Sequence, residues 1–301
     1  MAGSGGGRAT TRLKVAIVAS LEHLYPARDL LAFLELPAST YYYHRSRRPR
    51  SDPYVSVRPL IKETFERAYQ SYGYRRVRIA LKNQHGVHLN GKTVLKLMRQ
   101  EHCICRVRRK KYRSYRGQIG KAAPNILQRD FGAEVPNEKW VTDVTEFVVA
   151  GEKLYLSPLI DLFNGEVLTY TLRSTPNLQL VIDMLKPALA ALNSSSKPII
   201  HSDQGWQYQH RTYQRMVRGS GATQSMSRKG NCLDNAVAEN FFGHLKEEFI
   251  RRRHFASVED FRVDLDLYIH WFNNERIREK LDGLSPVEYR NSVSGRSFAL
   301  T

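Results

Sequence analysis

Hydrophobic positions recur with the period of an α-helix through the first hundred residues of the chain. Residues 12–25 have this spacing, and Pro26 stands where a second helix can begin. That helix would run to about Glu35, and after a Leu-Pro turn Ser39 would be the N-cap of a third helix. The outline is that of a helix-turn-helix, although a plain helical hairpin has the same pattern.

Three more helices are predicted after the loop RRPRSDP. They are the segments VRPLIKETFERAYQ, YGYRRVRIALKNQHG and NGKTVLKLMRQEH. Gly86 would end the second of these helices, and Asn90 would cap the third. Three short helices with arginines such as Arg75 and Arg76 on their surface are typical of a helix-turn-helix domain that binds DNA.

From Pro136 onward the pattern changes to that of strands. KWVTDVTEFVVA, KLYLSPLIDLF and GEVLTYTLR are strand-like, with hairpin signals at Ala150-Gly151 and Asn164-Gly165. A helix, the strand KPIIHSD, a helix, the short strand ATQSMS and another helix follow. Three antiparallel strands before alternating helices and strands predict an α/β fold with a mixed five-stranded sheet and flanking helices. This is the order of a ribonuclease-H-like domain.

These patterns divide the chain into six segments. They are a flexible N-terminus (1–11), a helix-turn-helix-like segment (12–50), an all-α helix-turn-helix-like DNA-binding domain (51–104), a basic linker (105–135), a ribonuclease-H-like core with a C-terminal helix (136–291) and a tail (292–301).

Composition limits the class of protein. The chain has 301 residues, of which 42% are hydrophobic, so its domains can bury real cores. No signal peptide and no apolar run near about 18 residues is present, which favours a cytoplasmic protein. Three cysteines fit a reducing compartment. The spacing of His85, His88, Cys103 and Cys105 is too tight for a tetrahedral zinc site.

The positive charge of the chain lies entirely in its N-terminal part. Residues 1–125 contain 26 Lys/Arg against 7 Asp/Glu, giving +19, whereas residues 126–301 contain 21 against 22, giving −1. The positive charges of such a segment repel one another unless a bound polyanion neutralises them, and nucleic acid is the usual polyanion. A membrane surface is disfavoured because the basic residues are not gathered on one amphipathic helix. Residues 105–121 alone hold eight basic side chains, which would clamp phosphates.

The segment LDNAVAENFFGHLKEEF predicts a helix that starts at Leu233. On a wheel of about 100° per residue, its apolar side carries Val237, Ala238, Phe241, Leu245 and Phe249. The opposite side carries Asn235, Glu239 and Lys246. Taken alone, Glu239 is better explained as a surface acid than as a functional one.

Two aspartates fall where a sheet of this kind could bring them to that helix. Asp143 lies in the first predicted strand, and Asp203 ends the fourth, where the carboxyl end of a strand opens toward ligands. Two neighbouring strands and a helix across their edge can bring Asp143, Asp203 and Glu239 to one point. Three clustered carboxylates repel unless a cation holds them, and hard ions such as Mg²⁺ prefer oxygen ligands.

Each acid also has an ordinary structural explanation. Asp143 could be a hydrogen-bonding group at a strand end, and Asp203 could be a turn former. Asp161, Glu146 and Asp234 are further acids of the same type. Glu146 would point across the sheet from Asp143, and Asp234 falls on the apolar side of its helix. Asp161 is the hardest of these to set aside.

The three acidic segments together resemble a known catalytic core. WVTDVTEF, HSDQGWQY and SRKGNCLDNAVAENFFGHLKEE are similar to the motifs of DDE transposases and retroviral-type integrases. Thirty-five residues separate Asp203 from Glu239 (239 − 203 − 1), which is the spacing of this group. SYGYRRVRIAL, RVRRKKYRSY and NNERIREKLDGLSPVEYR narrow the resemblance to the second-frame (OrfB) product of the insertion-sequence-three family of bacterial mobile elements. It covers about residues 12–291.

The resemblance implies a chemistry. Asp143, Asp203 and Glu239 would be the catalytic carboxylates and would hold Mg²⁺ or Mn²⁺, as two ions roughly 3.5–4 Å apart. Water would first release a 3′-OH at the end of the element, and this 3′-OH would then attack another strand. No covalent enzyme intermediate is needed. His201, two residues before Asp203, would support the site from the same strand face.

The resemblance and the charge pattern together suggest DNA contacts from several segments. The predicted contacts are Tyr41, Arg45, Arg75, Arg76, Arg108, Arg109, Lys110, Lys111, Arg113, Asn235 and Lys246. Lys246 would reach a phosphate or a terminal base, and Asn235 would also support the acidic cluster.

Double-stranded DNA is the implied partner, as the element's terminal inverted repeats and as target. A homo-oligomer on DNA is expected, together with an upstream-frame partner or fusion. Two alternatives stay open, which are a ribonuclease-H-like nuclease that does not join strands and an inactive DNA-binding regulator. The two basic helical modules argue against the nuclease, and the three acids argue against the regulator.

Overall fold

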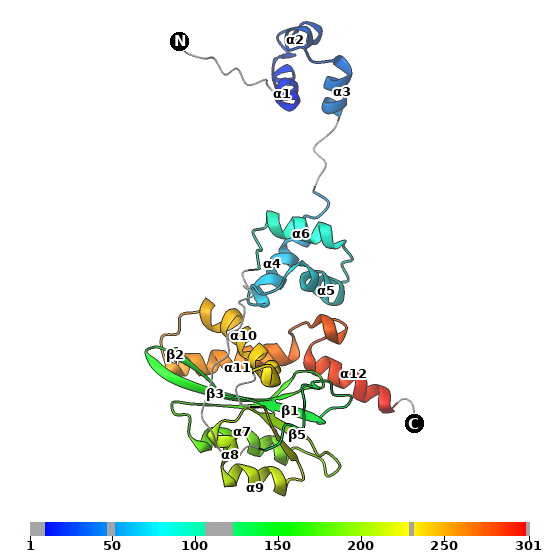
Figure 1. Ribbon diagram of the computed structural model, residues 1–301. Helices are drawn as coiled ribbons and strands as arrows, with labels where there is room; N and C mark the ends of the chain where they lie inside the picture. The colour runs from blue at the N-terminus through cyan, green and yellow to red at the C-terminus, as the bar shows by residue number, and fades with distance from the viewer. Residues whose placement is uncertain (1–9, 47–51, 106–122, 229–231, 299–301) are drawn as a thin grey trace. The chain divides into compact units, whose positions relative to one another are not determined.

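The computed structural model describes residues 10–46, 52–105, 123–228 and 232–298 (Figure 1). The chain divides into two compact units, Met1–Val57 and Arg58–Thr301. Among the described residues, every helix is too short or too polar to cross a lipid bilayer.

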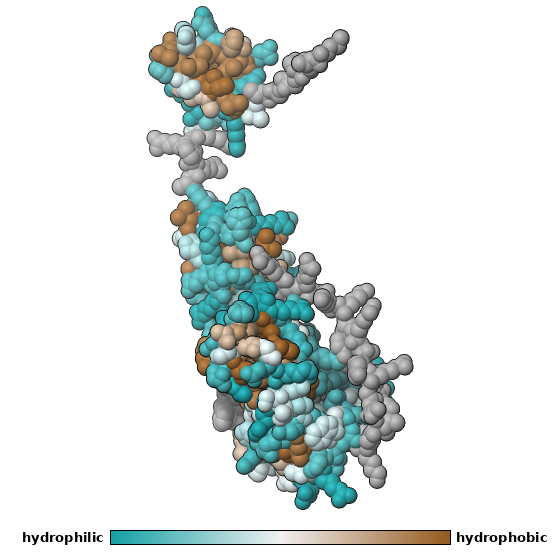
Figure 2. Space-filling model, turned by 90° about the vertical axis from the view of Figure 1, so that its left-hand side faces the viewer, coloured by the Kyte–Doolittle hydropathy of each residue, from teal (hydrophilic) through white to brown (hydrophobic). Residues whose placement is uncertain are grey.

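The first unit is a set of three short helices. They are α1 (Thr11–Leu21), α2 (Ala27–Phe33) and α3 (Ala38–Ser46). Their small core consists of Val18, Leu31, Leu36 and Tyr41. Several large apolar side chains remain exposed, and hydrophobic surface is visible on this unit in Figure 2. Because α3 already begins at Ala38, Ser39 lies in its first turn and is not the N-cap that the sequence suggested.

The second unit begins with a three-helix domain. Its helices are α4 (Val57–Arg67), α5 (Tyr74–His85) and α6 (Gly91–Gln100). Gly86 ends α5 in a left-handed conformation with φ +65°, which glycine adopts without steric cost. The Asn90 side chain accepts a hydrogen bond from the Lys92 N–H and so caps α6. The predicted end at Gly86 and the predicted cap at Asn90 are therefore confirmed, whereas the helix predicted over VRPLIKETFERAYQ already ends at Arg67.

A mixed sheet forms the centre of the catalytic part. Its strands are β1 (Lys139–Thr142), β2 (Thr145–Val149), β3 (Glu152–Asp161), β4 (Val167–Arg173), β5 (Ile199–Ser202) and β6 (Thr223–Met226). β2, β1 and β4 pair antiparallel with β3, whereas β5 pairs parallel with both β1 and β6. On β3, Tyr155 pairs with both β2 and β4, and Ile160 pairs with both β1 and β4. β4 therefore lies along one edge of β3, and β1 and β2 lie along the opposite edge.

The prediction of five strands is corrected to six. The run KWVTDVTEFVVA is predicted as one strand, yet it forms two strands separated at Asp143 and Val144. The Val144 N–H donates to the Asp143 carboxylate at 2.8 Å and is therefore not available to the sheet. Asp143 is the first residue after β1 and does not lie within a strand.

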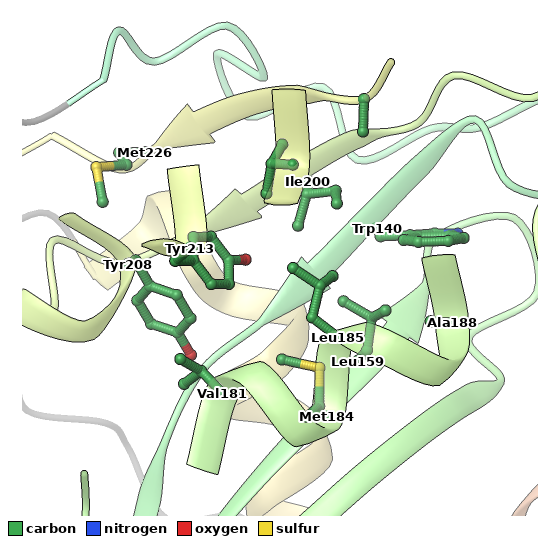
Figure 3. Packing of buried hydrophobic residues seen from close by; sticks show 12 residues of the cluster. Trp140, Leu159, Val181, Met184, Leu185, Ala188, Ile200, Tyr208, Tyr213 and Met226 are labelled. Carbon is green, nitrogen blue, oxygen red and sulfur yellow. The ribbon is translucent and has the colours of Figure 1, made fainter. Parts of the chain in front are cut away.

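Helices cover both faces of the sheet (Figure 1). They are α7 (Leu178–Ala190), α8 (Trp206–Gln209) and α9 (Arg211–Gly219) on one face, and α10 (Ala236–His244) and α11 (Val258–Asn274) on the other. A cluster including Trp140, Leu159, Met184 and Tyr213 fills the space between the sheet and α7–α9 (Figure 3). The single helix predicted near 208–217 is two helices, because His210 is extended and caps α9 with its side chain.

The helix that carries Glu239 departs from the regular pattern at both ends. It begins at Ala236, after a 3₁₀ turn over Cys232–Asn235, and not at Leu233. A π-turn over Leu245–Phe249 and a 3₁₀ turn over Ile250–Arg252 continue it. The last helix, α12 (Pro286–Phe298), runs across the boundary at 291/292 that the sequence suggested for a tail.

Candidate active site

The pairing of β1 with β5 brings two aspartates side by side. The two strands are parallel, with Val141 opposite His201. Continuing this register by two residues places Asp143 opposite Asp203, each just past the end of its strand. The carboxyl ends of parallel strands meet at one edge of a sheet, which is where open α/β sheets bind ligands.

Backbone groups orient both carboxylates. The Val144 N–H donates to Asp143 Oδ1 at 2.8 Å, and the Gly205 N–H donates to Asp203 Oδ1 at 2.9 Å. Gly205 lies so close that a Cβ there would stand 2.9 Å from Asp203 Oδ1. Within the described part of the chain, neither aspartate forms an ion pair with a basic side chain.

The charges at this edge oppose one another. Burial raises the pKa of Asp143 well above its usual range, the Asp203 and Glu239 carboxylates raise it further, and the Val144 N–H offsets part of the shift. The pKa of Asp203 is raised by burial and partly restored by the Gly205 N–H. Glu239, in the first turn of α10, is therefore near enough to Asp143 to act on it electrostatically.

Two further predicted residues lie in the same region. Asn235 is 3% exposed and lowers the pKa of Asp143, yet neither of its amide atoms has a hydrogen-bond partner of ordinary geometry. Lys246 is partly buried, which lowers the pKa of its ammonium, while Asp143 raises it. The structure therefore gathers Asn235 and Lys246 around the three acids.

The donor chemistry fits a divalent cation. The carboxylates of Asp203 and Glu239 raise the pKa of Asp143, and such a group of acids is neutralised by a hard cation better than by a protein hydrogen bond. Among the described residues, no three His, Cys, Asp or Glu side chains are gathered tightly enough to hold a metal ion as they stand. The acids thus share a region without forming a closed ligand set.

Asp161 is a structural acid of a different kind. It ends β3 and is 0% exposed. Its carboxylate accepts the backbone N–H of Asn137 at 2.9 Å and of Phe163 at 3.0 Å, and Arg290 of α12 donates to it at 2.6 Å. Burial raises the pKa of Asp161, but these three donors lower it. Its oxygens are used in joining β3, the preceding loop and α12.

The other alternative acids are also paired. Asp234 accepts hydrogen bonds from Arg228 and Arg129, each at 2.9 Å, and these arginines hold the pKa of its carboxyl far below the usual range. Glu146 forms an exposed ion pair with Lys153 at 3.0 Å. Neither acid contributes a carboxylate to the cluster around Asp143.

His201 has a partner other than Asp203. Its Nδ1 lies 2.8 Å from the Ser225 hydroxyl, which also accepts the N–H groups of Ile126 and Leu127. Ser225 therefore donates its proton to His201, and burial lowers the pKa of the imidazole. His201 fastens residues 126–127 to the sheet, so the structure gives it an anchoring contact away from the carboxylates.

Several predicted DNA contacts are engaged inside the protein. Tyr41 is 0% exposed and donates to Glu22 at 2.5 Å, which places it in a core and not on the surface that the prediction needs. Arg45 pairs with the same Glu22 at 2.9 Å. Arg75 lies 3.8 Å from Glu279, and Arg76 is partly buried over the Tyr72 ring. The predicted contacts at Arg108, Arg109, Lys110, Lys111 and Arg113 lie outside the described residues.

The prediction overlooked a basic face on α6. Lys92, Lys96 and Arg99 are exposed and are spaced i, i+4 and i+7, so they line one side of the helix. No ion pair to an acid is found for these three within the described ranges. The spacing is readable in GKTVLKLMRQ, but the more frequent arginines of α5 drew the prediction there.

Comparison with known proteins gives a consistent result. Residues 133–232 and 239–293 match the integrase core domain, and residues 56–111 match an HTH-like domain. The chain is 48% identical over 277 residues to the putative transposase InsK for insertion sequence element IS150 of Escherichia coli K12, covering 92% of this chain and 98% of that one. It is 31% identical over 285 residues to the E. coli K12 transposase InsF for insertion sequence IS3A, covering 93% and 99%.

Among solved structures, the HTLV-2 integrase catalytic core domain in complex with magnesium is similar, with 17% identity and a TM-score of 0.43. It matches 53% of this chain and 99% of that one.

Proposed function

The chain belongs to the insertion-sequence-three family of DNA transposases, and we propose that it processes the terminal inverted repeats of its element with Asp143, Asp203 and Glu239 as the catalytic carboxylates. Its integrase core cleaves and joins DNA strands, and its HTH-like domain binds DNA. Catalysis by a core of this type depends on a divalent metal ion.

Asp143, Asp203 and Glu239 are the proposed metal ligands. They offer hard oxygen donors, which suit Mg²⁺ or Mn²⁺, and two ions per site are expected. When bound, the ions would stabilise negative charge on the attacking and leaving oxygens of an in-line displacement at phosphorus. Support comes from the unpaired charges of Asp143 and Asp203 at adjacent strand ends.

Groups of the chain itself prepare the site for the reacting phosphate. The N–H groups of Val144 and Gly205 hold the aspartates in fixed orientations, so little reorganisation is needed when DNA arrives. Lys246 would place its ammonium on a phosphate or a terminal base beside the carboxylates. Asn235, whose buried amide lowers the pKa of Asp143, would hydrogen-bond to the acidic cluster or to the DNA end.

Within the HTH-like domain, α6 is the proposed DNA-contacting helix. Its exposed row of Lys92, Lys96 and Arg99 offers charges that form no ion pair with an acid of the described residues. The surface of this domain is mostly hydrophilic on the face shown in Figure 2. The basic linker would add phosphate contacts that hold the duplex without reading its sequence.

The enzyme is expected to work as an oligomer on DNA. An element has two ends, and joining both to one target calls for at least two active sites held together. An upstream-frame partner or fusion is expected from the family, because the described helices contain no sustained heptad pattern of their own.

One observation carries the proposal, namely that Asp143 and Asp203 lie opposite each other past the ends of parallel strands and form no ion pair with a basic side chain of the described residues. The test is a strand-joining assay with the purified chain, a terminal-repeat duplex with a free 3′-OH, a target plasmid and Mg²⁺ or Mn²⁺. We expect joined products that require the metal and the repeat. Cleavage without joining would favour the nuclease, and binding without either would favour the regulator.

A further inference from the structure

The turn between α4 and α5 inserts into the core of the same unit. Tyr69 and Gln70, at φ +52° and +51°, reverse the chain there. The Tyr69 ring packs 4.8 Å from that of Trp271 and 5.4 Å from that of Tyr268, both on α11. The Arg252 guanidinium donates to the Tyr69 carbonyl at 2.6 Å. This turn is therefore held by the segment that directly continues the Glu239 helix.

Tyr72 completes the attachment. Its hydroxyl accepts the Ile277 N–H at 2.7 Å and donates to the Glu275 carbonyl at 3.4 Å, so it binds both sides of Arg276. Burial raises the pKa of Tyr72 to about 12, which keeps the hydroxyl protonated. The HTH-like domain thus contacts the core at the backbone that presents Arg276.

Arg276 in turn binds Glu248, which lies in the segment that continues the Glu239 helix. Glu248, in the π-turn, is 1% exposed and Arg276 is 2% exposed at the side chain. Arg276 Nε donates to Glu248 Oε2 at 2.9 Å and a terminal nitrogen donates to Oε1 at 2.5 Å. Tyr268 donates to the same carboxylate at 3.2 Å. Burial alone would raise the pKa of Glu248, but Arg276 and His244 hold it well below the usual range.

The position of Glu248 along the helix gives this pair a consequence for the active site. Nine positions after Glu239, at about 100° per residue, Glu248 falls on the opposite side of the helix. One helical stretch therefore offers Glu239 and Lys246 to the acidic site and Glu248 to the interior. A π-turn at this point is a local departure of the kind that often marks functional sites.

Glu248 also balances charge across the boundary between domain and core. Arg276 and Arg278 lie over the Phe272 ring at 5.2 and 4.8 Å. Burial and the neighbouring Arg276 and Arg76, the latter on α5, lower the pKa of Arg278 to about 10. Glu248 favours the charged form of all three arginines. Without its carboxylate, Arg76 would be repelled by two buried guanidiniums of the core.

We propose that Glu248 is a positioning residue, which through Arg276 ties the helix bearing Glu239 and Lys246 to the Tyr69–Tyr72 turn of the HTH-like domain. Docking of the DNA-binding domain then sets the alignment of the third catalytic carboxylate. This inference rests on the proposed role of Glu239. The residue itself touches neither DNA nor the reacting phosphate.

The first test is Glu248→Gln in the full chain, with Glu247→Gln as the matched control. Glu247 is the neighbouring acid, and its partner Arg251 is about half exposed. We expect Glu248→Gln to slow single-turnover strand joining by about 10²-fold, as for a misplacement of about 1 Å, and to raise the Mg²⁺ concentration at half-maximal rate. Terminal-repeat affinity should stay within about twofold, and the Glu247→Gln variant should join normally.

A second variant separates positioning from loss of folding. Glu248→Met combined with Arg276→Met removes both charges, and an apolar replacement of a whole buried pair is often neutral for stability. We expect this double variant to have a melting temperature near that of the wild type and to bind the repeat normally. It should nevertheless join strands at least about tenfold more slowly than the wild type. If it or Glu248→Gln joined at the wild-type rate, Glu248 would not position the helix.

The Glu239→Gln variant distinguishes failure of the proposed function from failure of the role inferred for Glu248. Normal joining by Glu239→Gln would remove the proposed function and this inference with it. Loss of joining in Glu239→Gln, together with normal joining in both Glu248 variants, would overturn the inference alone.

Discussion

Two ends of the same sheet carry aspartates whose surroundings differ. At the end of β3, Asp161 is fully buried and receives two backbone N–H groups and the Arg290 guanidinium. At the ends of β1 and β5, Asp143 and Asp203 are partly exposed and receive one backbone N–H each, and neighbouring carboxylates raise the pKa of Asp143. Burial raises the pKa at both ends, so that shift does not distinguish the two groups of acids. What distinguishes them, within the described residues, is whether a basic side chain compensates the charge.

The same criterion applies to other acids and to bases. Asp234 and Glu248 are each 1% exposed, yet each has arginine partners that hold the pKa of its carboxyl low. Among the bases, Arg75 faces Glu279 of the core, whereas Lys96 on α6 faces no acid among the described residues. Charges that the fold leaves uncompensated are the ones expected to meet metal or DNA.

The largest effect should come from neutralising the three proposed metal ligands. Asp143→Asn, Asp203→Asn or Glu239→Gln each removes a charged ligand from a shared cation site worth several kcal/mol, so joining should fall on the order of 10³-fold or more. Single-turnover joining in Mg²⁺ and in Mn²⁺ is the measurement. A variant that retained near-normal activity would identify its residue as misassigned.

Asp161→Asn should have the opposite pattern, because it should lower the stability of the fold and leave strand joining nearly unchanged. The change removes the ionic partner of Arg290 and a strong acceptor for two backbone donors, which should lower the free energy of unfolding by about 1–3 kcal/mol. Joining per folded molecule should remain close to that of the wild type. Urea unfolding and active-fraction-corrected joining measure the two parts. Loss of joining in a stably folded variant would place Asp161 in the catalytic set.

The distinction between these acids could not be read from the sequence. Arg290 is 129 positions from Asp161, and nothing local announces their contact. The break after Thr142 was equally hidden, since no glycine or proline marks it in KWVTDVTEFVVA and it depends on the Asp143 side chain accepting the Val144 N–H. The hairpins at Ala150-Gly151 and Asn164-Gly165 were predictable, because left-handed backbone at Gly151 and Gly165 favours glycine. The glycine turns and the Asn90 cap could be predicted from local signals, whereas the cap predicted at Ser39 was wrong and partners distant in sequence could not be predicted.

A smaller effect, of opposite sign, is expected for stability at the catalytic edge. In EDTA, Asp143 is a partly exposed carboxylate that two others repel, and this repulsion is unfavourable for the folded state. Asp143→Asn should therefore raise the free energy of unfolding by about 1 kcal/mol, while abolishing joining. Thermal unfolding of wild type and variant in EDTA, compared with Asp161→Asn, gives the measurement. A destabilised Asp143→Asn protein would mean that the carboxylate has a structural partner.

The smallest effects should appear in the salt dependence of DNA binding, where the contrast between compensated and uncompensated bases can be measured one residue at a time. Each phosphate contact adds about 0.9 to the slope of log affinity against log salt concentration. Lys96→Ala should reduce that slope by about one contact, because its charge has no acid partner in the described structure and is available to a phosphate. Arg75→Ala is the matched control on α5, and it should leave the slope nearly unchanged because Glu279 lies 3.8 Å from its guanidinium. Gel-shift titrations of the full chain on terminal-repeat and scrambled duplexes, across a series of salt concentrations, give both slopes.

Equal losses of slope for the two variants would show that ion pairing within the protein does not decide which basic side chains reach DNA. An unchanged slope for Lys96→Ala would remove α6 from the interface.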